Sequence, residues 1–254
     1  MVDKNTACCP PDSLGGLKTD YKPRGVIQNF DGLSVYTVGQ GEKAIIVIHD
    51  LLGVDSGRTK EICDQFADAG YLIVMPDFFE GDGGTEKDFL EGFFLFKTYS
   101  IMKRLWKVPF KKVQEHLNKS IYPFLESKGV KKIGTMGFCW GGFIVFNICA
   151  DERVGAGVGF HPVYDKFFVS VQKLTEAVKC PQLICPAEND SNEMKEGQKI
   201  EKTLRKRLGD DVKIKTFPEM QHGFVNRGDM KDPKVERDVK EAIKLAFEHF
   251  EKYL

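Results

Sequence analysis

Short runs of apolar, mostly β-branched residues recur along this chain and alternate with longer amphipathic segments. AIIVIHD (44–50) and YLIVMPD (71–77) are two such runs, and both end in turn-forming residues. Similar runs lie at 131–138, 154–160, 180–187 and 212–217, and helical patterns lie at 56–69, 110–127, 140–150, 193–208 and 234–252. Near-continuous apolar strands are typical of a parallel sheet that is covered on both faces. The alternation therefore predicts a doubly wound, mostly parallel α/β sheet with helices on both faces.

A hairpin is predicted before the first parallel strand. The β-prone runs at 26–30 and 33–38 are separated by Asp31-Gly32, a pair that favours a tight turn. Residues 1–22 are rich in proline, glycine, serine and charge and show no periodicity, so we expect an extended N-terminal arm there. No linker divides the rest of the chain, and we predict one α/β domain over residues 23–254.

The charge balance and the cysteine pattern narrow the cellular setting. Lys+Arg and Asp+Glu both number 37, which gives a formal net charge of zero and no electrostatic reason for a nucleic-acid partner. Apolar runs fall far short of the roughly 20 residues that span a bilayer, and the first residues lack the apolar core of a signal peptide. Seven scattered cysteines do not resemble a disulfide framework. We expect a cytoplasmic monomer with free thiols, and no membrane partner.

The most specific motif is GFCWGG at 137–142, which follows a predicted strand and opens a predicted helix. It is the nucleophile elbow G-x-S-x-G with the sulfur of Cys139 in place of oxygen. The turn is so tight that the residues two positions before and after the nucleophile must lack side chains. The thiol would then lie at the positive end of a helix, where thiolate and oxyanion are favoured. The alternative is a buried small cysteine beside glycines needed only for packing.

A thiol nucleophile needs a base, and the base needs an orienting acid. His222 follows the last predicted strand and precedes the final helix, which is where an α/β-hydrolase carries its base. Asp190, in the AEND sequence after the preceding strand, is the preferred acid, and Glu188 is the alternative. Cys139, Asp190 and His222 then occur in the order nucleophile, acid, base.

Several other residues have a weaker interpretation. His161 ends a strand at the same sheet edge as Cys139, so it either lines the pocket or is a hydrogen-bonded structural histidine. His116 and His249 lie in charged helical stretches and are expected at the surface. The aromatic-rich segment 80–109 is a lid or substrate wall, or else a crossover helix. Neither a metal nor another cofactor is expected, because no zinc-site spacing occurs. Four cysteines in apolar patterns are predicted core residues: Cys63, Cys149, Cys180 and Cys185.

With these residues identified, the chain resembles the dienelactone hydrolase (carboxymethylenebutenolidase-like) family of the α/β-hydrolase fold. The resemblance runs from about Arg24 to Leu254 and rests on GFCWGG, GYLIVMPDFF (70–79), AEND (187–190) and QHGF (221–224). It implies that Cys139, Asp190 and His222 are the catalytic triad.

The resemblance also implies roles beyond the triad. The backbone amides of Leu51 and Trp140 would form the oxyanion hole. Asp50 occupies a position where the family usually has Glu, a carboxylate that keeps the resting thiol neutral until substrate arrives. Bacterial relatives bind the substrate carboxylate with arginines, one of which follows the PD motif; PDFFEGDGG (76–84) has none. Arg227 is then a partial substitute for this clamp, or a surface loop residue.

The expected function is hydrolysis of small lactones or activated carboxylic esters through a Cys-His-Asp triad and a thioester intermediate. The alternative is a non-enzymatic thiol redox switch or a ligand-binding module on a hydrolase fold. In the switch, Cys139 is the oxidisable thiol, and Cys8 and Cys9 provide a resolving or metal-scavenging pair.

Overall fold

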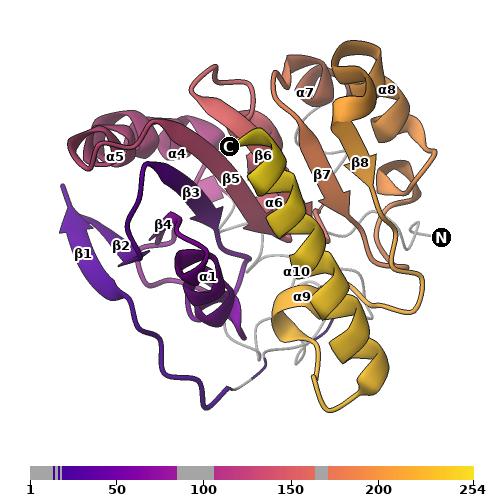
Figure 1. Cartoon of the computed structure of the whole chain (residues 1–254), viewed down its shortest axis with the longest axis horizontal. Coiled ribbons are helices and arrows are strands. Elements are labelled where there is room, and N and C mark those ends of the chain that lie inside the picture. Colours follow the sequence, from indigo (N-terminus) through magenta and orange to yellow (C-terminus); the bar gives the residue numbers. More distant parts are fainter. Residues whose placement is uncertain (1–13, 15–16, 18, 85–105, 164–170) are drawn as a thin grey trace.

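A mixed sheet organises the part of the chain that this computed structural model describes, which is residues 14, 17, 19–84, 106–163 and 171–254 (Figure 1). Its eight strands lie in the order β1-β2-β4-β3-β5-β6-β7-β8. The two pairs β1–β2 and β2–β4 are antiparallel and the others are parallel. The predicted hairpin and the mostly parallel sheet are thus confirmed. The strands are β1 (Val26–Phe30), β2 (Leu33–Val38), β3 (Lys43–Ile48), β4 (Leu72–Pro76), β5 (Lys132–Phe138), β6 (Val154–Phe160), β7 (Gln182–Cys185) and β8 (Val212–Ile214).

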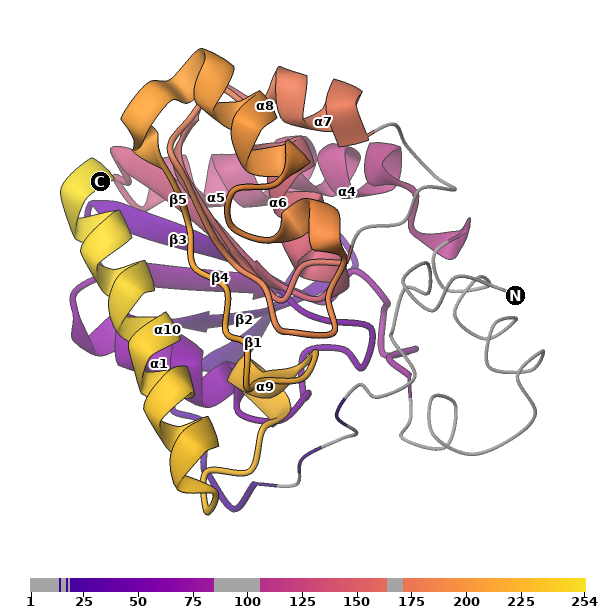
Figure 2. The ribbon, with the colours of Figure 1, turned by 90° about the vertical axis from the view of Figure 1, so that its right-hand side faces the viewer.

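Helices cover both faces of this sheet, as predicted (Figure 2). The helices α1 (Thr59–Asp68) and α10 (Pro233–Tyr253) lie on one face. The other face is covered by α4 (Phe110–His116), α5 (Tyr122–Ser127), α6 (Trp140–Ile148), α7 (Val171–Ala177) and α8 (Lys199–Leu208).

The residues of β3 explain why its apolar run is nearly continuous. Ala44, Ile46 and Ile48 pack in the core cluster that includes residues of α4, α5, α6 and α8. Ile45 and Val47 point the opposite way, into the cluster that includes residues of α1 and α10. Successive side chains of a strand alternate between faces, so burial on both faces requires apolar residues at every position.

Two predicted helices are interrupted for identifiable reasons. The segment 110–127 contains a π-helical turn, Leu117–Ile121, between α4 and α5. Pro123 follows this turn and has no amide hydrogen to continue the regular i to i−4 ladder. The helix predicted over 193–208 is shorter because Gly197 has a φ of 74°, which ends any helical path before α8.

Burial confirms the prediction for the four core cysteines, all of which are at most 4% exposed. The surface prediction for His249 is wrong, because this residue follows Ala246 by three positions on the buried side of α10 and is 8% exposed. The aromatic segment between 85 and 105, most of the N-terminal arm, Cys8 and Cys9 lie outside the described residues.

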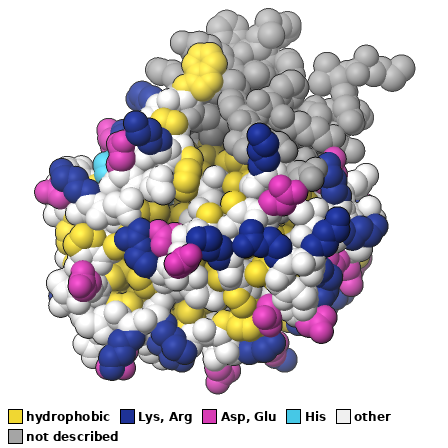
Figure 3. Space-filling model, turned by 90° about the horizontal axis from the view of Figure 1, so that it is seen from above, with side chains coloured by type: hydrophobic (Ala, Val, Ile, Leu, Met, Phe, Trp, Pro, Cys, Tyr) yellow, Lys and Arg dark blue, Asp and Glu magenta, His cyan; other side chains and the backbone are white. Residues whose placement is uncertain are grey.

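The surface carries both signs of charge. On the face seen in Figure 3, basic and acidic side chains are intermixed among apolar ones, in keeping with the balanced composition. Among the described residues, no helix combines the length and the apolar character needed to cross a membrane.

Candidate active site

Cys139 forms the one-residue link between β5 and α6. Its φ of 55° and ψ of −115° place it in a region that residues with side chains rarely adopt. Its amide donates a 3.1 Å hydrogen bond to the carbonyl of Phe160, which fixes the turn to the neighbouring strand β6. The strand–turn–helix context that the elbow motif predicts is therefore present.

The glycines around Cys139 are required by close backbone contacts. A Cβ atom on Gly137 would lie 2.3 Å from the backbone of Gly141, and one on Gly141 would lie 2.2 Å from the carbonyl oxygen of Ile48. A Cβ on Gly142 would lie 2.7 Å from Cβ of Pro162. These contacts leave no room for any side chain. They also seat the first turn of α6 against the end of β3, which brings the elbow close to the residues after that strand.

His222 and Asp190 form a buried pair at the ends of the last two strands. Nδ1 of His222 lies 2.6 Å from Oδ1 of Asp190. The second carboxylate oxygen, Oδ2, accepts a 2.7 Å hydrogen bond from the amide of Ala187, so the carboxylate is held at both ends. The alternative acid, Glu188, is exposed and lies 3.3 Å from Nζ of Lys195. The geometry thus pairs the preferred acid with the predicted base.

The pKa of His222 is raised to about 10. Burial is the largest single influence and lowers the pKa, but it is outweighed by the charges of Cys139 and Asp190 and by hydrogen bonds to both. Since Nδ1 faces Asp190, Nε2 is the ring nitrogen left for Cys139. Cys139 has no exposed surface. The charges and hydrogen bonds of Cys139 and Asp190 thus favour the protonated form of the His222 imidazole.

His161 follows β6 and lies beside this pair. Its ring centroid is 5.0 Å from that of His222, and its φ of 35° is again unusual for a residue with a side chain. Neither ring nitrogen has a hydrogen bond of standard geometry to the residues that the structure describes. Burial, followed by the positive charges of His222 and Arg227, holds the pKa of His161 well below its usual range. Burial thus favours the neutral form of His161, whereas the pKa of the neighbouring His222 is raised.

The backbone amides of the turn that follows β3 differ in whether they have an acceptor among the described residues. The amide of Gly53 donates to the carbonyl of Asp50 at 3.1 Å, and the amide of Leu52 donates to Oδ1 of the Asp50 carboxylate at 2.9 Å. The amide of Leu51 donates to no acceptor among the described residues. The same holds, within those residues, for the amide of Trp140, the first residue of α6.

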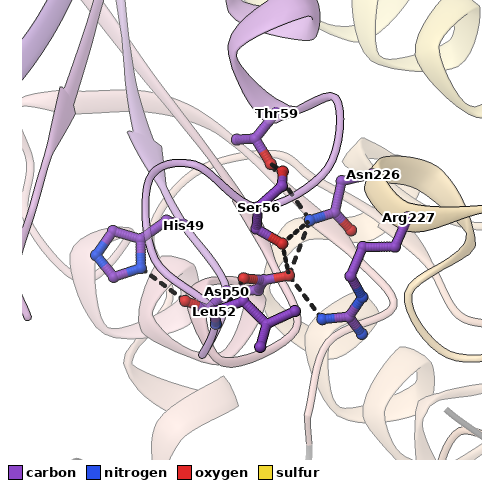
Figure 4. Close-up of polar contacts among 7 residues, drawn as sticks. All are labelled: His49, Asp50, Leu52, Ser56, Thr59, Asn226 and Arg227. Atoms are coloured by element: carbon purple, nitrogen blue, oxygen red, sulfur yellow. Dashed lines mark hydrogen bonds and ion pairs between the residues drawn. The ribbon is translucent and has the colours of Figure 1, made fainter. Parts of the chain in front are cut away.

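The Asp50 carboxylate is held in a buried polar cluster (Figure 4). Oδ2 accepts hydrogen bonds from Ser56 Oγ at 2.7 Å, from Asn226 Nδ2 at 2.9 Å and from Arg227 Nη1 at 2.7 Å. Arg227 belongs to the short helix α9 (Phe224–Arg227) and is only 5% exposed, so it is not a surface loop residue. Asp50, expected to gate the thiol, and Arg227, expected to bind substrate, thus contact each other.

Sequence reasoning missed three polar residues of this region. His49, Ser56 and Asn226 are each buried in contact with Asp50, and none of them belongs to the motifs that carry the family resemblance. The only signal in the sequence that could have indicated these residues was their position, because His49 directly precedes Asp50 and Asn226 directly precedes Arg227. Among the described residues, no group of three or more His, Cys, Asp or Glu is arranged to hold a metal ion.

Comparisons with known proteins agree with this architecture. The model of the dienelactone hydrolase family matches residues 30–254. A carboxymethylenebutenolidase homolog of Xenopus tropicalis is 28% identical over 265 residues, covering 98% of this chain and 99% of the relative. Hydrolase tropI of Talaromyces stipitatus is 26% identical over 263 residues, covering 98% and 96%. The crystal structure of a dienelactone hydrolase from Anabaena variabilis has a TM-score of 0.56 at 16% identity and covers 92% of this chain and all of that one. The predicted α/β-hydrolase fold is confirmed.

Proposed function

This chain belongs to the dienelactone hydrolase family and is a hydrolase of carboxylic esters or lactones, and on that premise we propose that Cys139, His222 and Asp190 are its catalytic triad. The observation that carries the proposal is the 2.6 Å contact between His222 Nδ1 and Asp190 Oδ1, with Cys139 raising the pKa of the same imidazole. A nucleophile, a base and an orienting acid in this arrangement are what acyl transfer requires.

The proposed cycle has two acyl-transfer steps. The Cys139 thiolate attacks the carbonyl carbon, and the tetrahedral oxyanion is bound by the amides of Leu51 and Trp140. The bond to the leaving oxygen then breaks, and the His222 imidazolium gives its proton to the departing alkoxide or enolate. The neutral imidazole next accepts a proton from water as that water attacks the thioester. Collapse of the second intermediate releases the acid and restores the thiolate, while Asp190 keeps Nδ1 protonated throughout.

Sulfur limits the substrates that such a cycle can process. A thiolate is a better leaving group than an amine, so an adduct with an amide would expel sulfur and return to the starting material. Esters with stabilised leaving groups and lactones partition forward. We therefore propose small lactones and activated esters as substrates. We also propose that the enzyme is a monomer and works without a cofactor.

The polar residues around the triad are proposed to recognise the substrate. Arg227 would attract an acidic substrate group, in competition with Asp50, and the neutral imidazole of His161 would donate a hydrogen bond to the acyl portion. Thiol gating by Asp50 stays a proposal. In the structure, Oδ2 of this carboxylate is held by Ser56 and Asn226.

The test is hydrolysis of p-nitrophenyl acetate by purified variants. We expect Cys139→Ala to lose nearly all turnover, and His222→Ala to lose at least about a hundredfold. Cys63→Ala, which removes a buried thiol on the helix α1, is the control and should retain activity. Unchanged turnover in Cys139→Ala would overturn the triad. A reactive Cys139 without hydrolysis of any ester or lactone would favour the thiol-switch alternative.

A further inference from the structure

We propose that His49 is a positioning residue of the oxyanion hole, because its imidazole fixes the peptide group whose other edge carries the Leu51 amide. The proposal rests on the proposed function, which gives that amide its role. His49 directly follows β3 and has no exposed surface. Among the described residues, its ring forms hydrogen bonds with the backbone of Asp50 and Phe78 and with neither Asp190 nor His222. Its role would therefore be exerted through the backbone that it holds.

The hydrogen bonds of the His49 ring determine its tautomer. Nε2 accepts a 3.2 Å hydrogen bond from the backbone amide of Phe78. An amide can only donate, so Nε2 carries a lone pair and the ring hydrogen is on Nδ1. Nδ1 lies 2.7 Å from the carbonyl oxygen of Asp50 and therefore donates to it. Burial lowers the pKa of His49, which keeps the ring in this neutral form.

The donated hydrogen bond orients the next peptide group. The carbonyl of Asp50 and the amide of Leu51 belong to one planar trans unit and point in opposite directions. Two donors, Nδ1 of His49 and the amide of Gly53, hold the carbonyl. The N–H of Leu51 is therefore directed away from the His49 ring. Rotation of this peptide would break both bonds, so the ring restricts the direction in which the amide can donate.

The same ring packs against the residue that supplies the second proposed donor. Its centroid is 5.6 Å from the ring of Trp140 and 4.8 Å from that of Phe79. The His49 ring thus packs against the Trp140 ring at an interplanar angle of 34° and holds the Asp50–Leu51 peptide through Nδ1. One side chain would set the spacing of the two amides that must converge on a single oxygen.

The turn has a second support that does not depend on His49. In Figure 4 the His49 ring and the cluster of Ser56, Asn226 and Arg227 approach Asp50 from opposite sides. The ring contacts the carbonyl, whereas the cluster contacts the carboxylate. A change at position 49 therefore leaves the carboxylate anchored, and the turn is expected to persist with a less restricted peptide.

Two amide substitutions separate the two hydrogen bonds of the ring. In His49→Asn the side-chain NH2 lies near the place of Nδ1 and can still donate to the Asp50 carbonyl. In His49→Gln the amide group lies near the place of Nε2, where its oxygen can accept from Phe78, but the donor to Asp50 is lost. Both variants carry a side-chain amide, but His49→Asn keeps the hydrogen bond to Asp50 and His49→Gln keeps the one from Phe78.

The experiment measures two rates on each variant. Acylation is the burst of p-nitrophenol in stopped flow, and it depends on the oxyanion hole. Alkylation of Cys139 by iodoacetamide, quantified by peptide mass spectrometry, needs the thiolate but no oxyanion hole. Removing one oxyanion donor typically costs ~10²–10³ in rate. We expect His49→Gln to acylate at least ~10-fold more slowly, with alkylation within about twofold of wild type, since a misdirected donor is partly lost.

The outcomes distinguish this proposal from the triad assignment. His49→Asn should acylate within about threefold of wild type, because it keeps the orienting donor. Wild-type acylation by His49→Gln, or a parallel fall in acylation and alkylation, would overturn the role of His49. If His49→Gln does not fold, a loss above tenfold in His49→Asn with unchanged alkylation would overturn it. Activity in Cys139→Ala would instead remove the triad on which the proposal rests.

Discussion

The His222 imidazole and the Asp190 carboxylate are joined by a 2.6 Å contact between Nδ1 and Oδ1, and both side chains are at most 2% exposed. Oδ2 of the same carboxylate is held by the amide of Ala187. The carboxylate is therefore fixed in direction before any substrate binds. In the proposed cycle this fixed direction keeps Nε2 turned toward Cys139.

Asp190→Asn is expected to reduce hydrolysis by up to about 10⁴-fold while the protein remains folded. The amide has the same shape but no charge, so it neither stabilises the imidazolium nor enforces the tautomer with hydrogen on Nδ1. Steady-state kinetics with an activated ester provide the measurement. Glu188→Gln is the matched control, two positions away and exposed, and should stay within about twofold. Equal losses in the two variants would contradict the assignment of the acid.

Gly141→Ala is expected to destabilise the elbow by at least about 2 kcal/mol and to abolish activity. The new Cβ would lie 2.2 Å from the carbonyl oxygen of Ile48, so α6 and β3 would have to separate. Gly159→Ala, in the strand β6, is the control, because its Cβ would meet no atom nearer than 3.7 Å. Urea unfolding of both variants measures the difference. Wild-type stability in Gly141→Ala would show that the elbow is less tightly packed than described.

The Asp50–Arg227 ion pair predicts strong coupling between two substitutions. Arg227→Met leaves a buried carboxylate without its cation and should cost about 3 kcal/mol or more in unfolding free energy. Adding Asp50→Asn removes the unpaired charge and should recover at least about half of that loss. A double-mutant cycle by urea unfolding measures the coupling. Additive losses in the double variant would show that the pair contributes no mutual stabilisation.

Titration of His249 should make the fold sensitive to acid. Burial lowers its pKa to about 4, so between about pH 6.5 and pH 4 the unfolded chain binds a proton that the native state does not. Stability is therefore complete above the unfolded pKa and is lost as pH falls through this window. From pH 7 to pH 4.5, wild type should lose about 2 kcal/mol more unfolding free energy than His249→Gln. Parallel pH profiles of the two proteins would contradict this prediction.

Much of the fold could be predicted because its signals are local. The nearly continuous apolar run of β3 indicates burial on both faces of the sheet, and Asp31-Gly32 indicates a hairpin independently of the rest of the chain. The GFCWGG motif likewise encodes a strand, a turn and a helix within six residues. Each of these elements follows from sterics that operate over a few residues.

The polar cluster around Asp50 could not be predicted, because its members meet only in the folded chain. Asn226 lies 176 residues after Asp50, and nothing in its neighbourhood indicates an acidic partner. The burial of His249 was missed for a related reason, since the charged residues beside it lie on the other side of α10. The domain boundary near residue 23, the cytoplasmic location and the monomeric state stay predictions.

The crowding around Cys139 has a consequence for the choice of reacting atom. Backbone atoms of three neighbouring segments enclose the glycines on either side of position 139. None of these backbone contacts depends on whether the side chain at position 139 ends in sulfur or in oxygen. The scaffold defines a location, and an oxygen would occupy it as readily as a sulfur. Chemical preference among carbonyl substrates can therefore change at one atom without any change of architecture.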